Sequence, residues 1–368
     1  MNSDSHNPLP IVTVVIPCRN EEKLIASCLD SVIASNYPQD KLEVFVVDGE
    51  SNDRTRYITE EYTIRFPFIR LLDNPKRHFA AAVNEGISYA SGEIVVLMGA
   101  HAVYEKGYIS QCVRFLGEYD ANNVGGSLVP TPLEDTVMAK AITLALAHPF
   151  GAGNAYFRIG SKEPRWVDTV FGGCYEKTVF ENIGLFNEDL SRSADLEFNM
   201  RLRDTGGKIL LVPSIVVHYY PKSRLKDFLV HSLSDGFWAV YPLKFGSRPF
   251  FLRHLIPLTF VSSLIGSAAL SAVTSFFLWF LGGILCAYAL ANIGSAVHVS
   301  LKERSLKYLP ALLLAFPARQ FPYGVGSLYS LLRVFTSAQF WRHRLESVRT
   351  KAVAREETGE WPNGKAPV

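Results

Sequence analysis

The first part of the chain, residues 11–235, alternates short runs of β-branched and aliphatic residues with longer mixed segments. Apolar runs of this kind are typical of strands that are buried on both faces. Polar residues such as Asn20 and Asn52 stand where the longer segments begin, as the N-caps of helices do. The order of these segments predicts an α/β fold, a mostly parallel sheet with helices on both faces. The predicted strands are 12–16, 44–48, 69–72, 94–98, 124–129 and 208–212, and the predicted helices are 21–35, 53–65 and 80–90.

The character of the chain changes after this region, because no Asp, Glu, Lys or Arg occurs from residue 255 to residue 297. A helix over this stretch would be about 65 Å long at 1.5 Å per residue, roughly twice the 30 Å hydrocarbon core of a bilayer. We therefore predict two membrane spans, at about 255–272 and 276–297. A further apolar stretch at about 308–335 carries Arg319, and we expect it to re-enter the membrane or to lie at its surface.

These changes predict five parts: a polar tail at 1–10, a catalytic domain at 11–235, an interfacial linker at 236–254, a membrane region at 255–335 and a polar tail at 336–368. Basic residues flank both ends of the predicted membrane hairpin, which places these ends in the cytosol. The first residues lack the basic and apolar segments of a signal peptide. We therefore expect a multi-pass protein of the inner, cytoplasmic membrane with its catalytic domain in the cytosol.

The overall composition excludes several classes of protein. Lys and Arg total 37 and Asp and Glu total 35, so a net charge of +2 argues against a nucleic-acid partner. A content of 48% hydrophobic and 20% charged residues excludes a disordered chain. The five cysteines form no CxxC pair, which argues against a disulfide framework or a zinc site.

Candidate chemistry follows the predicted strands, where ligands bind in parallel sheets. Pro17, Arg19 and Glu21 follow the first strand, Asp48 ends the second, and His101 follows the fourth. A carboxylate at a strand end, such as Asp48, accepts hydrogen bonds from a nucleobase N–H or a ribose hydroxyl. By chemistry alone, Asp48 is equally well a turn residue and Glu21 a helix-capping residue. No GxxxxGK[ST] phosphate loop occurs in the sequence.

Four segments resemble the motifs of family 2 glycosyltransferases. They are VVIPCRNE at 14–21, VVDGESNDRT at 46–55, NPKR at 74–77 leading to AVNEGI at 82–87, and FGGC at 171–174 followed by NIGLF at 182–186. The resemblance covers roughly residues 11–215 and implies the GT-A fold, a single Rossmann-like domain that binds a nucleotide sugar. The membrane hairpin and the Ala100-His101 pair are similar to bacterial exopolysaccharide transferases of the succinoglycan type.

The resemblance also implies roles for individual residues on the donor side. Asp48 is expected to bind the nucleotide, and Arg77 is expected to offset the pyrophosphate charge together with Lys76. The alternative for Arg77 and Lys76 is an ordinary solvated basic pair at the start of a helix. The full predicted nucleotide-sugar site consists of Pro17, Arg19, Glu21, Asp48, Arg77 and Ala100.

On the acceptor side, the segment around Asp195 resembles the Glu-Asp motif in which the Asp is the catalytic base, although Ala194 replaces the Glu. An inverting transfer needs such a base to take the proton of the acceptor hydroxyl. The alternative for Asp195 is a carboxylate at the start of a helix. Gly172 and Gly173 are expected beside the sugar or acceptor. Arg224 is expected either to close over the diphosphate or to anchor the chain at the membrane surface.

The chain departs from its apparent relatives at Gly99-Ala100-His101, where most members carry Asp-x-Asp and bind a divalent metal. We expect His101 to be the metal ligand, with Mn²⁺ preferred over Mg²⁺ because an imidazole suits Mg²⁺ poorly. The alternative is a histidine that packs at a strand end. Loss of the first carboxylate, at Gly99, would weaken metal binding or impair catalysis.

The sequence predicts an inverting glycosyltransferase that moves a hexose from a nucleoside-diphosphate sugar, UDP-glucose or a similar donor, to a lipid-linked glycan. The expected acceptor is anchored by a polyprenyl diphosphate, and polysaccharide-assembly proteins are possible partners. One alternative is transfer directly to a polyprenyl phosphate. The other is a non-catalytic assembly subunit, because Gly99 and Ala194 replace acidic residues of the family. A processive synthase is disfavoured because its QxxRW motif is absent from the sequence.

Overall fold

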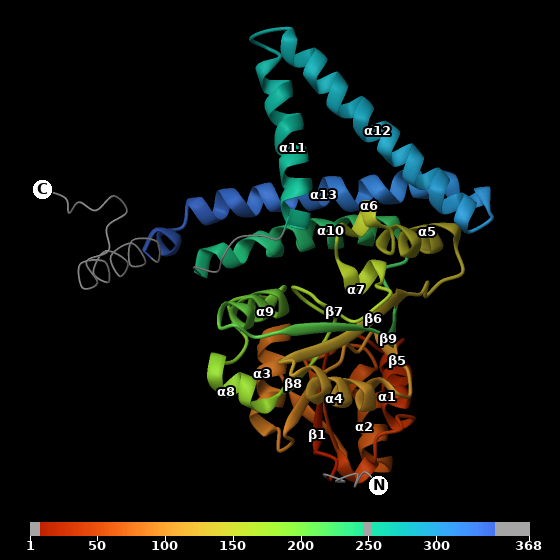
Figure 1. The fold of residues 1–368 in the computed structure, drawn as a ribbon, viewed down its shortest axis with the longest axis vertical. Coiled ribbons are helices and arrows are strands. Elements are labelled where there is room, and N and C mark those ends of the chain that lie inside the picture. Colours follow the sequence, from red (N-terminus) through yellow and green to blue (C-terminus); the bar gives the residue numbers. More distant parts are fainter. Residues whose placement is uncertain (1–7, 246–251, 343–368) are drawn as a thin grey trace, which may run out of the picture.

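The computed structural model describes residues 8–245 and 252–342. The greater part of the predicted tails at 1–10 and 336–368, and the middle of the predicted linker at 236–254, lie outside the described residues. Figure 1 shows an α/β domain at one end of the molecule and long helices at the other. The site described below lies where these two parts meet.

One half of the sheet is parallel, as the apolar runs predict. β1 pairs with β2 on one side and β4 on the other, and β2 pairs with β3. Val14 and Ile16 of β1 pack into one apolar cluster and Val15 into another, so both faces of this strand are buried. The elements of this half are β1 (Val12–Cys18), α1 (Ile25–Ile33), β2 (Leu42–Asp48), α2 (Thr55–Arg65), β3 (Ile69–Asp73), α3 (Phe79–Tyr89) and β4 (Ile94–Leu97).

The other half of the sheet is mixed, so the predicted parallel arrangement does not extend across it. β8 runs antiparallel to both β4 and β6, β6 is parallel to β9, and β5 and β7 are antiparallel to β9. The pattern did not predict β5, β7 or β8, since each is too short for a periodic signal. The elements are β5 (Ala102–Tyr104), α4 (Tyr108–Tyr119), β6 (Asn123–Pro130), β7 (Arg165–Trp166), β8 (Gly173–Glu176), α8 (Lys177–Ile183), α9 (Ala194–Asp204) and β9 (Ile209–Tyr219).

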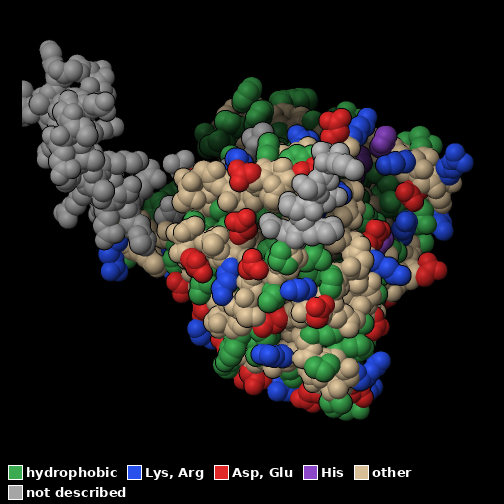
Figure 2. Space-filling model, turned by 60° about the horizontal axis from the view of Figure 1, so that its bottom comes forward, with side chains coloured by type: hydrophobic (Ala, Val, Ile, Leu, Met, Phe, Trp, Pro, Cys, Tyr) green, Lys and Arg blue, Asp and Glu red, His purple; other side chains and the backbone are tan. Residues whose placement is uncertain are grey.

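Helices cover both faces of this sheet. The cluster on one face includes Ile25 of α1 and Ile109 of α4, and the cluster on the other includes Val83 of α3 and Phe198 of α9. The α/β fold class predicted from the sequence, a sheet domain followed by helices, is therefore confirmed. Acidic and basic side chains are interspersed over the face of this domain that Figure 2 shows, as expected from the near balance of charge.

Two helices form a layer that lies across the α/β domain, α10 (Leu225–Val240) and α13 (Leu309–Phe335) (Figure 1). Glycines allow their backbones to approach closely, since a Cβ on Gly236 would lie 2.0 Å from the carbonyl oxygen of Tyr323. On Gly326, a Cβ would lie 2.1 Å from the carbonyl oxygen of Leu233. Three short elements, α5 (Val137–Leu146), α6 (Pro149–Ala152) and α7 (Tyr156–Ile159), connect this layer to the sheet.

α11 (Leu252–Leu270) and α12 (Phe276–Lys302) project away from this layer and from the catalytic domain (Figure 1). Within the described residues, Arg253–Leu270 and Phe276–Lys302 are long and apolar enough to cross a membrane. Only 17% and 6% of the residues in their apolar windows are buried, which distinguishes them from the core helices of soluble domains. Helices therefore lie where the two spans were predicted, and the crossing of a membrane by them stays a prediction.

The apolar stretch at about 308–335, which was expected to re-enter the membrane or to lie at its surface, forms one continuous helix, α13, with Pro317 and Pro322 inside it. It lies across the molecule rather than beside α11 and α12 (Figure 1). Its charged residue, Arg319, donates a hydrogen bond of 2.7 Å to Asp235 of α10. This ion pair explains how a helix of mostly apolar residues accommodates an arginine. The predicted domain boundary at residue 235 falls inside α10, so the layer and the domain share this helix.

Candidate active site

A cavity of about 750 Å³ lies between the α/β domain and the long helices. His101, Phe171 and Asp195 line it from the domain side. Phe260 of α11 and Tyr288 of α12 line it from the other side. The cavity therefore has one wall from the GT-A sheet and another from the helices that are apolar enough to enter a membrane.

Asp195 lies in the first turn of α9, beside the cavity. Ser193, just before the helix, has a left-handed backbone with φ 56°, which turns the chain sharply into α9. Burial raises the pKa of the Asp195 carboxyl above its ordinary value, although backbone hydrogen bonds at the helix start oppose this effect. A carboxylate with a raised pKa is a stronger base than an exposed aspartate, and this suits it to take a proton from a hydroxyl group.

Two neighbouring positions of the same segment, Glu197 and Ala194, do not line this cavity. Glu197 is 5% exposed and accepts a hydrogen bond of 2.7 Å from Nε of Arg201, so it serves the packing of α9. Ala194 is fully buried. A glutamate in place of Ala194 would therefore need the surrounding core to move.

The segments that follow β1 and β2 lie against each other, as expected for adjacent parallel strands. The backbone N–H of Asn20 donates to Oγ of Ser51 at 2.9 Å, and the N–H of Glu21 donates to Oγ1 of Thr55 at 2.7 Å. Asn20 has φ 56° and Glu50 has φ 53°, so both loops use left-handed residues to make their turns. Pro17, at the end of β1, pairs in register with Val47 of β2.

Asp48 ends β2 and is 1% exposed. Its carboxylate accepts a hydrogen bond of 2.5 Å from the hydroxyl of Ser51, and the guanidinium of Arg56 lies 3.7 Å away. These contacts hold the loop that follows the strand. The carboxylate lies at the end of the strand, as expected for a residue that binds the nucleotide. It also makes the loop contacts expected of the alternative, a turn residue.

The predicted diphosphate cations lie at the start of α3. Arg77 has a left-handed backbone with φ 60° and forms an ion pair with Glu50. Lys76 forms an ion pair with Glu188. Both side chains are more than half exposed, at 54% and 62%, so their partners can exchange for other anions at little energetic cost.

His101 and Glu21 meet across the sheet edge, although 79 residues separate them in the chain. Nδ1 of His101 lies 3.3 Å from Oε1 of Glu21, and the ring packs edge-on against Tyr219 with 5.3 Å between centroids. Ala100, beside it, is buried. Two ligand atoms at this separation can bind one cation, since atoms that lie about 2.1 Å from the same metal ion lie about 3 Å from each other.

The pair by itself is an incomplete metal site. Within residues 8–245 and 252–342, no group of three or more His, Cys, Asp or Glu side chains is placed to hold a metal ion. One imidazole nitrogen and one carboxylate oxygen fit Mn²⁺ as two ligands, so the remaining ligands would have to come from substrate or water. The residues present therefore fit a metal that binds together with a diphosphate.

The space of the missing carboxylate at Gly99 is restricted. A Cβ on Gly99 would lie 3.2 Å from Cζ of Phe171 and 3.7 Å from Cε1 of His101. Gly172 and Gly173 follow, with φ values of 67° and 119°, and a Cβ on Gly172 would lie 2.3 Å from the carbonyl oxygen of Leu97. These glycines let the start of β8 pass close to β4, which is a structural reason for the motif.

Four arginines line the cavity, and the sequence motifs predicted none of them. They come from distant parts of the chain: Arg158 of α7, Arg192 before α9, Arg253 of α11 and Arg319 of α13. Arg224, which the sequence predicted here, immediately precedes α10, is exposed and does not line the cavity. Arg19 is also exposed, in the loop after β1.

Asp235 connects this cluster. It accepts a hydrogen bond of 3.2 Å from Arg192 and one of 2.7 Å from Arg319. Nε2 of His231 lies 3.5 Å from Oδ1 of Asp235. Burial alone would raise the pKa of Asp235, but the neighbouring His231 and arginines outweigh burial and lower it. Burial also lowers the pKa of His231 to about 4, so this imidazole is neutral near pH 7.

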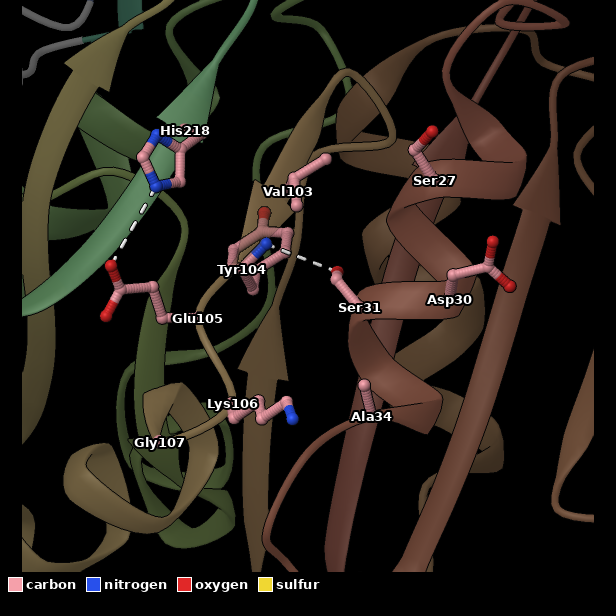
Figure 3. A pocket seen from close by; sticks show the side chains of 10 residues that line it. All are labelled: Ser27, Asp30, Ser31, Ala34, Val103, Tyr104, Glu105, Lys106, Gly107 and His218. Atoms are coloured by element: carbon pink, nitrogen blue, oxygen red, sulfur yellow. Dashed lines mark hydrogen bonds and ion pairs between the residues drawn. The ribbon is translucent and has the colours of Figure 1, made fainter.

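A second, shallower depression lies between α1 and the segment around β5, where Figure 3 shows its lining side chains. His218 and Glu105 lie 3.8 Å apart there, and Oγ of Ser31 accepts a hydrogen bond of 3.2 Å from the N–H of Tyr104. Its lining contains no residue predicted for the donor, the metal or catalysis. We therefore assign the chemistry to the cavity beside Asp195.

Comparisons with known proteins agree with this geometry. Residues 13–175 match the model of the family described as Glycosyl transferase family 2. The dolichyl N-acetyl-alpha-D-glucosaminyl phosphate 3-beta-D-2,3-diacetamido-2,3-dideoxy-beta-D-glucuronosyltransferase of Methanococcus voltae is 29% identical over 315 residues, which cover 83% of this chain and 93% of that protein. The succinoglycan biosynthesis protein ExoA of Rhizobium meliloti is 25% identical over 354 residues, 92% of this chain and 96% of that protein.

Among solved structures, the mannosyltransferase PcManGT from Pyrobaculum calidifontis, in complex with GDP-Man and Mn²⁺, superposes with a TM-score of 0.56. The identity is 20%, and the match covers 89% of this chain and 88% of that one, so this likeness concerns the fold alone. The motifs, the sheet and the curated relatives agree with one another. Residues 13–175 are therefore similar to family 2 glycosyltransferases, and the chain has the GT-A fold.

Proposed function

We propose that the chain is an inverting glycosyltransferase that moves a hexose from a nucleoside-diphosphate sugar to a lipid-linked glycan at the cytosolic face of the inner membrane. One observation carries the proposal: Asp195, a half-buried carboxylate with a raised pKa, lies in a cavity walled on the far side by α11, α12 and α13. A water-soluble donor and a membrane-anchored acceptor can meet only at such a boundary. By their names, the two curated relatives act on a dolichyl-linked saccharide and in succinoglycan biosynthesis.

In this mechanism, the Asp195 carboxylate takes the proton of the acceptor hydroxyl. The hydroxyl oxygen attacks the anomeric carbon on the side opposite the diphosphate, and a new carbon–oxygen bond forms. The bond to the diphosphate breaks, and its electron pair leaves with the nucleoside diphosphate. A single base at the acceptor side is what an inverting transfer requires, and general-base catalysis of this kind contributes about 10²- to 10⁴-fold in rate.

The donor is expected at the edge formed by the ends of β1, β2 and β4. Asp48 would bind the nucleoside, and Arg77 would exchange Glu50 for the donor pyrophosphate. The remaining contacts would come from Pro17, Arg19, Glu21 and Ala100. UDP-glucose or a similar UDP-hexose is the expected donor.

We expect His101 and Glu21 to hold a divalent cation, with Mn²⁺ preferred over Mg²⁺ because the pair contains an imidazole nitrogen. When bound, such a cation neutralises the charge that builds on the leaving diphosphate. The orientation of His101 is set by the chain itself, because the ring packs against Tyr219 and its Nδ1 faces Glu21.

The test uses the full chain in detergent, a panel of UDP- and GDP-hexoses and a polyprenyl-diphosphate-linked saccharide as acceptor, with release of the nucleoside diphosphate as readout. The parent should release it with one donor, and Asp195→Asn should not. Asp189→Asn, an exposed carboxylate in the loop before α9, is the matched control and should act as the parent does. A parent that binds UDP and transfers no sugar would instead identify a non-catalytic assembly subunit.

A further inference from the structure

The four arginines of the cavity are not equally satisfied. Arg192 and Arg319 share Asp235, and Arg253 forms an ion pair with Asp168. Arg158 forms no ion pair with any carboxylate in the described parts of the chain, and its Nη1 atom is buried without a hydrogen-bond partner. Its guanidinium lies over the rings of Phe157 and Tyr219, at 5.3 and 5.5 Å from their centroids.

This arrangement leaves a surplus of positive charge in an enclosed place. Among the described residues, two carboxylates, Asp168 and Asp235, pair with three of the four arginines, and Asp195 lines the cavity together with Asp235. The three histidines of the lining, His101, His231 and His254, bring no negative charge, and His231 is neutral near pH 7 because burial lowers its pKa to about 4. Arg158 is half-buried and, in the part of the chain that the structure describes, has no carboxylate in an ion pair with it; holding a cation in this way is costly, so the site is suited to a ligand that brings negative charge. Burial lowers the pKa of Arg158, in keeping with a guanidinium held away from water.

The same cavity continues into an apolar, aromatic wall. Phe260 of α11 stacks on Tyr288 of α12 with 4.8 Å between ring centroids, and Pro257 lies one turn before Phe260. Ile256, which also lines the cavity, is 60% exposed, so the wall reaches the outer surface of α11. A ligand that fits both regions has an anionic head and a long apolar tail.

We infer that Arg158, with Arg192 and Arg319 beside it, binds the phosphate of the lipid-linked acceptor, while the wall of Pro257, Phe260 and Tyr288 receives the first units of its hydrocarbon chain. This inference rests on the proposed function and extends it to the acceptor. Arginine suits the role because its planar guanidinium donates two parallel hydrogen bonds to phosphate oxygens. The phosphate would lie on the Asp195 side of the cavity, which would direct the attached sugar towards the base.

The donor also carries a diphosphate, so the experiment must distinguish binding of the lipid diphosphate from binding of the nucleoside diphosphate. Binding of farnesyl diphosphate and of UDP is measured by calorimetry on the full chain in detergent, for the parent, Arg158→Gln, Arg158→Lys and Arg165→Gln. Arg165 is an exposed arginine of β7 outside the cavity and is the matched control. Farnesol, which lacks the diphosphate, reports the contribution of the apolar wall alone.

We expect Arg158→Gln to weaken farnesyl diphosphate binding roughly tenfold or more, the effect of losing a charge-assisted hydrogen bond. Arg158→Lys should retain part of the affinity, and Arg165→Gln all of it. Binding of UDP and farnesol should stay within twofold of the parent for every variant. Equal loss of UDP affinity in Arg158→Gln would assign the arginine to the donor and overturn the inference, as would unchanged farnesyl diphosphate binding.

Turnover provides an independent readout. With the lipid-linked acceptor, Arg158→Gln should raise the KM for acceptor while the KM for donor stays constant. A parent that transfers no sugar would refute the proposed function, yet the calorimetric comparison would still decide the inference about Arg158. Thermal unfolding of Arg158→Gln near the parent temperature would show that the loss of binding does not arise from misfolding.

Discussion

Replacing Asp195 by Asn should separate catalysis from stability. The amide has the same shape as the carboxylate but cannot take a proton, so transfer should fall by about 10²- to 10⁴-fold. At 1.36 kcal/mol for each factor of ten, this loss corresponds to about 2.7–5.5 kcal/mol in the activation barrier. The KM values for donor and acceptor should change little, because Asp195 acts on the proton and not on the anchors of either substrate.

The stability of Asp195→Asn should equal or exceed that of the parent, although its activity falls. Burial raises the pKa of Asp195 in the folded chain, so this carboxyl holds its proton more tightly in the folded chain than in the unfolded chain. The stabilising contribution of such a group is fully present below the unfolded pKa and is lost as the pH rises through the folded pKa. At pH 7 the ionised carboxylate therefore opposes folding, and Asp195→Asn should unfold at a temperature equal to or above that of the parent.

The assay is transfer from the preferred UDP-sugar between pH 4.5 and 8, together with thermal unfolding in the same detergent. The parent should lose activity on the acid side at a pH above the usual range of an aspartate, since its base has a raised pKa. Asp189→Asn should match the parent in both measurements. A strongly destabilised Asp195→Asn, or one that transfers sugar at the parent rate, would show that Asp195 is only a helix-start residue.

Four further predictions follow from the site. Asp48→Ala should weaken UDP binding about 10- to 100-fold by calorimetry, and unchanged affinity would leave Asp48 as a turn residue. His101→Ala should reduce Mn²⁺-dependent turnover more than UDP affinity, and full parental activity in EDTA would contradict a metal role. Asp235→Asn removes the negative charge that two arginines share and should destabilise the fold by roughly 3 kcal/mol in chemical unfolding, whereas an unchanged midpoint would refute this role. Because His231 has a folded pKa of about 4, stability should decline as the pH falls from about 6.5 to 4, and His231→Gln should flatten that decline.

The parallel half of the sheet could be predicted because its strands are buried on both faces. Val14 and Val15 of β1 contact opposite clusters, and that leaves a continuous apolar run in the sequence. β8 could not be found in this way, since Gly173–Glu176 has four residues and begins with a glycine at φ 119°. Its place between β4 and β6 depends on pairing with distant strands, which no local pattern records.

The site shows the same division between local and long-range signals. The meeting of His101 with Glu21 follows from the rule that the ends of parallel strands share one edge, so the sequence could predict it. The cluster of Arg158, Arg192 and Arg319 could not be predicted, because it forms only when α13 packs on α10. Arg319 in an apolar stretch was the one sign of it, and it indicated a segment that re-enters the membrane or lies at its surface rather than a binding site.

The aromatic packing around Gly99 bears on whether the departures from the family motif mark a decayed enzyme. Phe171 lies where a side chain at Gly99 would extend, and Tyr219 packs against both Phe171 and His101, at 5.7 and 5.3 Å between ring centroids. Simple loss of a carboxylate would leave a gap, since cores relax only partly around a deleted group. Here the rings of Phe171, Tyr219 and His101 fill the space, and Nδ1 of His101 faces Glu21. Packing that orients the imidazole in this way is expected where the imidazole has a role of its own. The packing therefore favours a donor site in which His101 has taken the place of the carboxylate over a site that no longer functions.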